Sequence, residues 1–242
     1  MKSIYNEFYL GRLNAIAAQD TKALSVYMLK DALNSVGSFL RETLFISTEM
    51  NQELFFEVSN TDEEHLFYDY SKKSKNREME CNSIILPKAS LLFIDLLDKS
   101  VVRKEGGYLD IEHIHSLIVS IKKKHNLFTV VIDNIDKVQC TLMGRESLWR
   151  TNSSNAALYE DWKERRHEYI ISLLYWMAHK YKVVIIVGKE MKSDISTPVK
   201  LSDLKYIPYG NSSKIIENFM FFKEVINEKS GKKTVKLSKI KY

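Results

Sequence analysis

The feature that most constrains this chain is an apolar strand that ends on acidic residues. Residues 129–136 read Thr-Val-Val-Ile-Asp-Asn-Ile-Asp. A short unbroken run of Val and Ile is typical of a strand that is buried on both faces of a parallel sheet. Ligands of open α/β sheets bind at the carboxyl ends of the strands, where Asp133 would lie. The pattern therefore indicates an α/β domain in which Asp133 either takes part in a binding site or caps the following turn.

Further apolar segments alternate with amphipathic stretches along the chain. We predict strands over Leu13–Ala17, Thr43–Ser47, Leu91–Ile94, Phe128–Ile132 and Lys182–Val187. We predict helices over Ser25–Leu40, Gln52–Tyr70, Ile111–His125 and Trp162–Lys180. Alternation of strands with helices of this length favours right-handed βαβ crossovers, and therefore a mainly parallel, twisted sheet that is flanked by helices. A length of 242 residues suits a single domain over 1–242.

The pattern changes after Val187 to shorter units. Ile215–Phe222 and Thr234–Ile240 are predicted as closing strands, joined through the polar, glycine-containing turn Glu228–Lys233. This hairpin would give the sheet an antiparallel C-terminal edge. The segment Leu142–Asp161 is polar and aperiodic, and it is predicted to be a mobile loop.

Composition gives limited information about the cellular compartment and the binding partners of the chain. The net charge of +5 permits contact with DNA without arguing for it. The two cysteines have no spacing partner, no apolar run is long enough to span a membrane, and the start lacks the apolar region of a signal peptide. The chain is therefore expected to be cytoplasmic, with no membrane partner. The histidines and cysteines have no zinc-site spacing, so we expect no zinc site.

Basic and aromatic residues gather in two regions. Lysines are dense at 122–124 and from Lys229 to Lys241, where solvated surface is the simpler interpretation and contact with nucleic-acid phosphates is the alternative. Trp162, Tyr169 and Trp176 recur every seven residues, near Arg165 and Arg166. This spacing favours a buried helix face over a platform on which bases stack.

Several motifs in this order resemble the RecA-fold ATPase domain of DnaB-type replicative helicases. The segment 44–50, Leu-Phe-Ile-Ser-Thr-Glu-Met, is similar to that family's Ser-x-Glu-Met strand end, and 129–138 is similar to its Walker B strand. Leu201–Leu204 matches a following Ser-Asp-Leu, and 215–223 matches the next strand. The resemblance spans about 10–242 and implies a RecA-like P-loop NTPase fold. It also implies assembly with copies of the chain or with a related ATPase.

The resemblance assigns roles to individual residues. Glu49 stands where the family's glutamate polarises the attacking water, and Asp133 where its acidic residue serves the magnesium ion. Lys189 stands at the position of a γ-phosphate-sensing glutamine. The last strand of the family ends in Lys-x-Arg, which reaches a neighbour's nucleotide, and this chain has Lys239 and Lys241 there. The implied catalytic pair is Glu49 and Asp133.

The same comparison places a poor phosphate-binding loop at Ala18–Ser25. Counted back from Glu49 without gaps, both glycines of the motif are alanine and its lysine is Leu24, so only the metal-ligand hydroxyl remains, as Ser25. A two-residue deletion would instead put Lys22 at the lysine position, close to Thr21. Alanine adopts positive φ only at a cost, so neither alignment yields a phosphate cradle.

These departures predict a degenerate ATPase domain. We expect it to act as a binding or assembly module in DNA replication or recombination, without efficient ATP hydrolysis and with no cofactor. The alternative is an active DNA-dependent ATPase with an unusual P-loop. In that case ATP would contact Thr21, Lys22, Ser25, Lys189, Lys239 and Lys241, and Ser25 and Asp133 would hold Mg²⁺.

Overall fold

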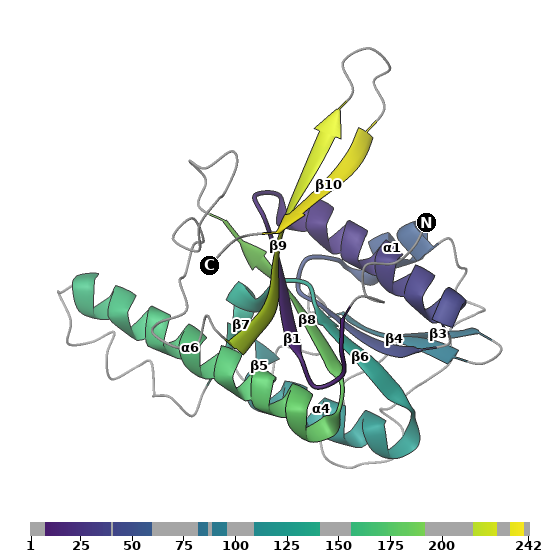
Figure 1. The fold of residues 1–242 in the computed structure, drawn as a ribbon, viewed down its shortest axis with the longest axis horizontal. Helices are drawn as coiled ribbons and strands as arrows, with labels where there is room; N and C mark the ends of the chain where they lie inside the picture. The colour runs from purple at the N-terminus through teal and green to yellow at the C-terminus, as the bar shows by residue number, and fades with distance from the viewer. Residues whose placement is uncertain are drawn as a thin grey trace.

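The chain folds around one large sheet that is covered by helices on both faces (Figure 1). The computed structural model describes residues 8–39, 41–59, 82–86, 89–95, 109–140, 156–191, 215–226 and 233–239. Its large sheet contains β1 (Leu13–Ala18), β2 (Glu42–Ser47), β3 (Asn82–Leu86), β4 (Ala89–Asp95), β6 (Leu127–Ile132), β8 (Val184–Glu190), β9 (Ile216–Ile226) and β10 (Lys233–Lys239). A small sheet pairs β5 (Leu109–Asp110) with β7 (Val138–Gln139). The helices are α1 (Thr21–Phe39), α2 (Gln52–Ser59), α4 (Ile111–Lys124), the 3-10 turn η4 (Ile135–Lys137) and α6 (Ala156–Tyr181).

The topology confirms the α/β prediction of a mainly parallel sheet. The order is β10-β9-β1-β8-β6-β2-β4-β3, and the pairs from β9 to β4 are parallel. The pairing of β10 with β9 is antiparallel, as predicted for the C-terminal edge. A second antiparallel pair, β3 with β4, closes the opposite edge. The central strands β1, β8, β6 and β2 thus bring their carboxyl ends to one edge of the sheet.

Side chains of the central strands alternate between two cores. Val130 and Ile132 of β6 pack in the core beneath α4 and α6, whereas Val131 packs in the core beneath α1 and α2. All three are fully buried. Burial on both faces explains why the strand is an unbroken apolar run. The two cores hold the sheet rigidly, so that residues just after each strand are placed with precision.

Two helices begin earlier than the sequence predicts. Helix α1 starts at Thr21 instead of Ser25 because the Asp20 side chain caps its first turn: Asp20 Oδ1 accepts from the Ala23 amide at 2.9 Å. Helix α6 starts at Ala156, so the prediction of a loop is wrong for residues 156–161. Ala156, Ala157 and Leu158 are strong helix formers, and their propensity outweighs the polar residues around them.

Other helix and strand boundaries differ from the predicted ones by a few residues, and some predicted segments lie outside the described residues. Strand β8 begins at Val184 and continues to Glu190, so Lys189 lies within a strand. Strands β3, β5 and β7 were not predicted. Residues 60–70, 142–155, 201–204 and most of the predicted turn at Glu228–Lys233 lie outside the described residues. No described helix is long and apolar enough to cross a membrane. One domain over 1–242 remains a prediction.

Candidate functional site

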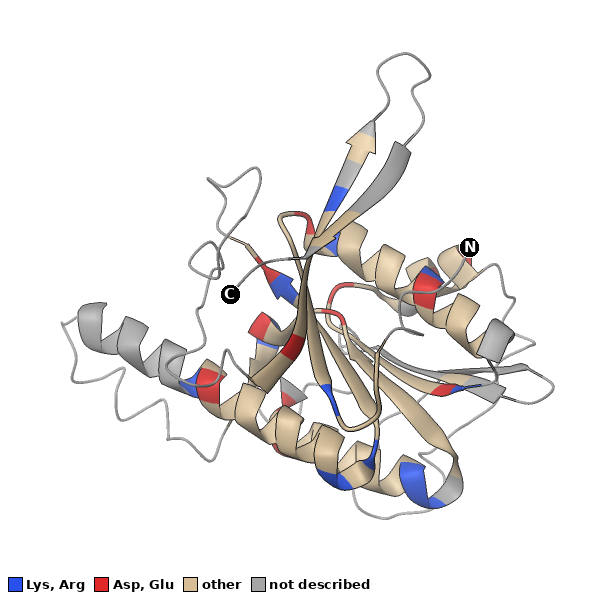
Figure 2. Ribbon diagram, viewed as in Figure 1, with Lys and Arg blue, Asp and Glu red and all other residues tan. Residues whose placement is uncertain are grey.

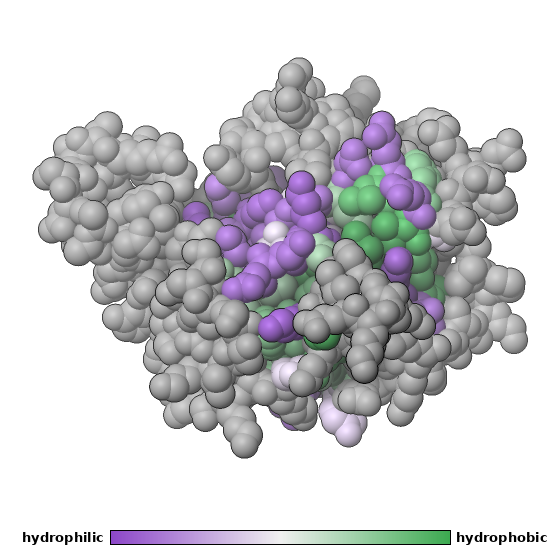
Figure 3. All heavy atoms as spheres, turned by 90° about the horizontal axis from the view of Figure 1, so that it is seen from above, coloured by the Kyte–Doolittle hydropathy of each residue, from purple (hydrophilic) through white to green (hydrophobic). Residues whose placement is uncertain are grey.

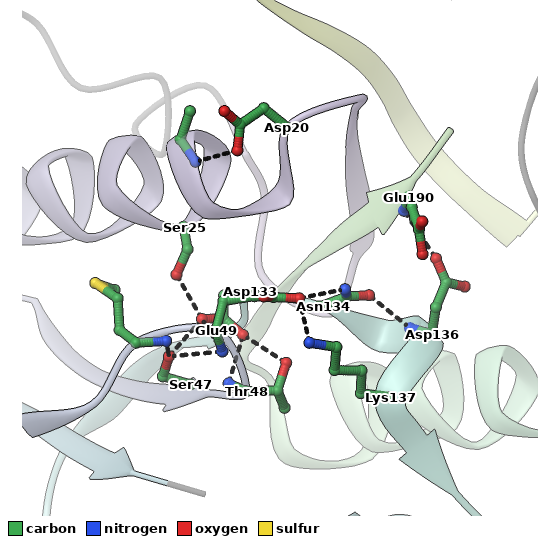
Figure 4. Close-up of polar contacts among 12 residues, drawn as sticks. Asp20, Ser25, Ser47, Thr48, Glu49, Asp133, Asn134, Asp136, Lys137 and Glu190 are labelled. Atoms are coloured by element: carbon green, nitrogen blue, oxygen red, sulfur yellow. Dashed lines mark hydrogen bonds and ion pairs between the residues drawn. The ribbon is translucent and has the colours of Figure 1, made fainter. Parts of the chain in front are cut away.

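Asp133 lies immediately after β6, fully buried at the carboxyl edge of the sheet. Its Oδ2 accepts hydrogen bonds from Ser25 Oγ and Ser47 Oγ, both at 2.5 Å, and from the Glu49 amide at 3.3 Å. Its Oδ1 accepts from the Thr48 amide at 2.7 Å and from Thr48 Oγ1 at 3.0 Å. The carboxylate therefore joins the ends of β2 and β6 to the first turns of α1 (Figure 4).

The alternative role for Asp133, as a cap of the next turn, is filled by its neighbour. Asn134 is the N-cap of η4, and its side-chain oxygen accepts from the Asp136 amide at 3.0 Å. Among the described residues, the hydrogen-bond partners of the Asp133 carboxylate therefore all lie far from it in sequence.

Burial dominates the acidity of Asp133. Removal from water raises the pKa of this carboxyl above its ordinary value, although the hydrogen bonds from Ser25, Ser47 and Thr48 lower it. Among the described residues, the recorded partners of this carboxylate are hydroxyl and amide donors rather than cations.

We expect this raised pKa to make the fold less stable as the pH rises from about 4, the ordinary Asp value. Between that value and the raised pKa, the folded protein keeps a proton that the unfolded chain has released, so a higher pH favours unfolding. Asp133→Asn has no such proton. Its free energy of unfolding should therefore rise relative to that of the wild type across this window, as measured by urea denaturation at a series of pH values. A difference that is flat or falls with pH would contradict the assignment.

The connection between β1 and α1 consists of two residues, Gln19 and Asp20. The Asp20 carboxylate accepts from the Ala23 amide, and its carbonyl accepts from the Leu24 amide at 3.1 Å. In phosphate-binding folds, the free amides and positive dipole at this helix N-terminus face an anion. Here an acidic side chain of the chain itself takes that position.

Glu49 follows Asp133's partner Thr48 and has two donors of its own. Its Oε1 lies 2.7 Å from Lys137 Nζ and 2.8 Å from Asn134 Nδ2, and only 6% of its side chain is exposed. Both donors come from the segment just after β6. The glutamate is therefore held toward η4 by a charge-assisted contact.

A second buried carboxylate, that of Asp136 in η4, lies beside the end of β8. Lys189 is 1% exposed, and its Nζ lies 2.6 Å from Asp136 Oδ1. Asp136 Oδ2 accepts from the Glu190 amide at 2.7 Å. His167 of α6 is fully buried, and its Nδ1 lies 3.7 Å from Asp136 Oδ1. These contacts join β8, η4 and α6 by a buried ion pair.

Some of the residues predicted as a site come together and others do not. Ser25, Glu49 and Asp133 share one network, and Lys189 joins the adjoining Asp136 cluster. Thr21 begins α1, and Lys22 is exposed beside it. Lys239 ends β10, and Lys241 lies outside the described residues.

The site also contains residues for which the sequence predicted no role: Ser47, Thr48, Asn134, Asp136, Lys137 and His167. The first five lie in the segments 44–50 and 129–138, whose resemblance to known motifs could have pointed to them. No sequence pattern marked His167.

The chemistry of this edge is a set of carboxylates already bonded within the protein. Glu49, Asp133 and Asp136 each accept from side chains or amides of the chain. The described residues contain no group of three or more His, Cys, Asp or Glu arranged to hold a metal ion. Seen from above, hydrophilic residues gather near the centre of the described surface, with a hydrophobic area beside them (Figure 3).

Comparisons with known proteins agree with this fold. No family model and no curated protein matches the sequence. The chain is similar to a solved structure described as a DnaB-like replicative helicase and its interactions with primase, with 13% identity and a TM-score of 0.59. The alignment covers 98% of this chain and 58% of the helicase chain, so the protein spans little more than half the length of that chain. At this identity the similarity shows the fold alone, which is RecA-like.

Proposed function

We propose that this protein is a RecA-like domain that no longer hydrolyses ATP efficiently. It serves as a binding or assembly module in DNA replication or recombination. The fold similarity supports the RecA-like part of this proposal, and the local geometry at the carboxyl edge supports the loss of hydrolysis.

The observation that carries the proposal is the connection between β1 and α1. A phosphate-binding loop needs several residues whose amides wrap the phosphates, followed by a lysine. Here Gln19 and Asp20 alone separate strand from helix, and the Asp20 carboxylate accepts from the Ala23 amide. A nucleotide phosphate at this position would meet a carboxylate that repels it. The residues present do not fit an ATP phosphate chain.

The acids support the same conclusion. A carboxylate that serves a magnesium ion or an attacking water needs free lone pairs on its oxygens. The two Asp133 oxygens accept five hydrogen bonds from the chain, and Glu49 is held by Lys137 and Asn134. Phosphoryl transfer depends on positioning and charge stabilisation, which these internally bonded groups do not offer.

Nucleotide binding tests the proposal directly. We expect calorimetric titration of the purified protein with ATP and Mg²⁺ to give only heats of dilution up to about 1 mM nucleotide, where binding would be worth about 4 kcal/mol. Melting temperature should not change with nucleotide, and phosphate release should equal that of a protein-free blank. Micromolar binding that requires Mg²⁺ and is lost in both Ser25→Ala and Asp133→Asn would overturn the proposal.

One observation favours the second candidate, an active ATPase with an unusual P-loop. Ser25 Oγ lies 2.5 Å from Asp133 Oδ2, so the two groups expected to serve Mg²⁺ do lie together. If this candidate holds, ATP and Mg²⁺ bind near Ser25 and Asp133, and Thr21, Lys22 and Lys189 lie close to the phosphates. The titration above separates the two candidates, because only the second requires nucleotide to bind.

We infer that the module works by association, with another copy of the chain, with a related ATPase or with DNA. RecA-like domains commonly assemble side by side, an inference that rests on fold analogy. Lys239 ends β10 at the C-terminal edge of the sheet, where such a neighbour would contact the domain. Lys241, which lies outside the described residues, is proposed to take part in the same contact. Sedimentation and single-stranded DNA binding at two salt concentrations test these partners, since phosphate contacts weaken steeply with salt.

A further inference from the structure

The amino-terminal edge of the sheet carries a second feature, far from Asp133. Four large hydrophobic residues are exposed in the described part of the chain: Tyr9 at 72%, Leu10 at 46%, Trp176 at 43% and Val225 at 39%. The first three lie around the end of α6. The seven-residue spacing suggested a buried face that includes Trp176, and the exposure of this residue corrects that interpretation.

Backbone contacts bring these residues together. Gly11 donates its amide to the Val183 carbonyl at 3.0 Å, and a Cβ at Gly11 would lie 3.7 Å from the Cα of His179. Tyr9 and Leu10 precede this contact, and Trp176 lies one helical turn before His179. The turn into β1 thus runs beside the C-terminal end of α6 (Figure 1). We call Tyr9, Leu10, Trp176, His179, Lys180 and Lys182 the basal patch.

The indole of Trp176 is held in place by its neighbours. Lys180 Nζ lies 4.3 Å from the centre of the ring. His115 of α4 lies 5.6 Å from it, and Tyr181 meets it edge-on at 6.1 Å. Tyr181 is fixed in turn by a 2.6 Å contact with His115 Nε2. An exposed aromatic side chain that is already ordered loses little entropy when a partner binds.

The two segments that form the basal patch carry basic but no acidic residues, and Glu217 of β9 at the same edge lies 3.3 Å from Arg12 Nε. His179, Lys180 and Lys182 are exposed. Neither segment 8–13 nor segment 169–183 contains an acidic residue. The last turns of α6 show blue and no red in Figure 2. Lysines at a helix C-terminus favour the helix dipole, which accounts for Lys180 but not for exposed Tyr9 and Leu10 beside it.

We propose that the basal patch binds an acidic, amphipathic segment of a partner protein. Exposed Trp and Tyr next to cations are the residue types that dominate protein interfaces. Leu10 offers an aliphatic contact that suits a protein side chain, whereas a nucleic acid would gain little from it. Lys180 also covers part of the Trp176 ring on which a base would stack. A second copy of this chain, with a net charge of +5, would bring more positive charge.

A defined peptide tests this proposal. The probe is a fluorescein-labelled peptide with leucines at helical spacing and glutamates between them, and its matched control has lysine in place of each glutamate. We expect fluorescence anisotropy to detect binding of the acidic peptide only. Lys180→Glu should weaken that binding roughly tenfold or more, because it reverses a contacting charge. Leu10→Ser should weaken it through the apolar contact. Lys30→Glu, an exposed charge reversal on α1, should leave it unchanged.

Three results would overturn the proposal. The first is no binding of the acidic peptide, and the second is binding that Lys180→Glu and Leu10→Ser leave intact. The third is that a labelled single-stranded oligonucleotide binds in place of the peptide and is lost in Lys180→Glu, which would make the patch a nucleic-acid surface. Circular dichroism of each variant confirms that it is folded. Because the patch lies at the opposite edge of the sheet from Asp133, nucleotide binding and peptide binding can fail separately.

Discussion

Lys189→Met is expected to lower the free energy of unfolding by about 3–5 kcal/mol, because it leaves the Asp136 carboxylate buried without its cation. Lys189 is 1% exposed and the Asp136 side chain 4%, and the Nζ–Oδ1 distance is 2.6 Å. Asp136 would keep the Glu190 amide and the proximity of His167. Chemical denaturation at neutral pH measures the loss.

Lys137→Met provides the matched control within the same network. Lys137 pairs with Glu49 at 2.7 Å, but half of its side chain is exposed, at 49%, and Asn134 remains as a donor to Glu49. Its removal should therefore cost about 1 kcal/mol or less. The double variant Lys189→Met, Asp136→Leu should recover much of the stability, since an apolar pair replaces a buried ion pair at little cost. Equal losses for the two lysine variants would show that the burial of Lys189 is not what makes its pair matter.

Most of the sheet was predictable because its strands are buried on both faces. The Val and Ile runs in β6 and β8 are rich in β-branched residues and are typical of central parallel strands. The order of strand and helix then indicated the crossovers. Strands β5 and β7 have two residues each, which is too short for any periodic signal to appear. Strand β3 is a short apolar run of the kind that periodicity alone does not assign.

The site was predictable in position but not in its bonding. Glu49 and Asp133 follow β2 and β6, and neighbouring parallel strands bring such residues together. The sequence carries no sign that Lys189 pairs with Asp136, which lies 53 positions away. Each of these residues fits its own local pattern, and only the arrangement of β8 beside β6 makes them neighbours. The capping bond of Asp20 is different, because it joins residues three positions apart and decides locally where α1 begins.

Gly188→Ala is expected to destabilise the protein by about 3 kcal/mol. A Cβ at Gly188 would lie 1.9 Å from the Asp133 carbonyl oxygen and 2.7 Å from its carbonyl carbon. Both atoms belong to the backbone, so no side-chain rotation relieves the overlap. The chain leaves β6 directly across from Gly188, because Ile132 pairs with Val187. Relief of the overlap requires Asp133 to move, and that movement weakens its hydrogen bonds to Ser25 and Ser47. Thermal and urea denaturation measure the total cost.

Gly11→Ala separates this steric effect from the backbone preference of glycine. Gly11 has φ of +78°, but a Cβ there makes only ordinary contacts, the nearest at 3.7 Å. Its substitution should cost about 1–2 kcal/mol from the left-handed backbone alone. Gly188 has the opposite combination, because the space for a Cβ is missing and its φ is not among the positive values. If Gly188→Ala proves milder than Gly11→Ala, the end of β6 yields easily, and the buried carboxylate network around Asp133 is less rigid than its hydrogen bonds imply. If it is the more severe of the two, the close approach of β8 to Asp133 is what fixes the geometry of the candidate site.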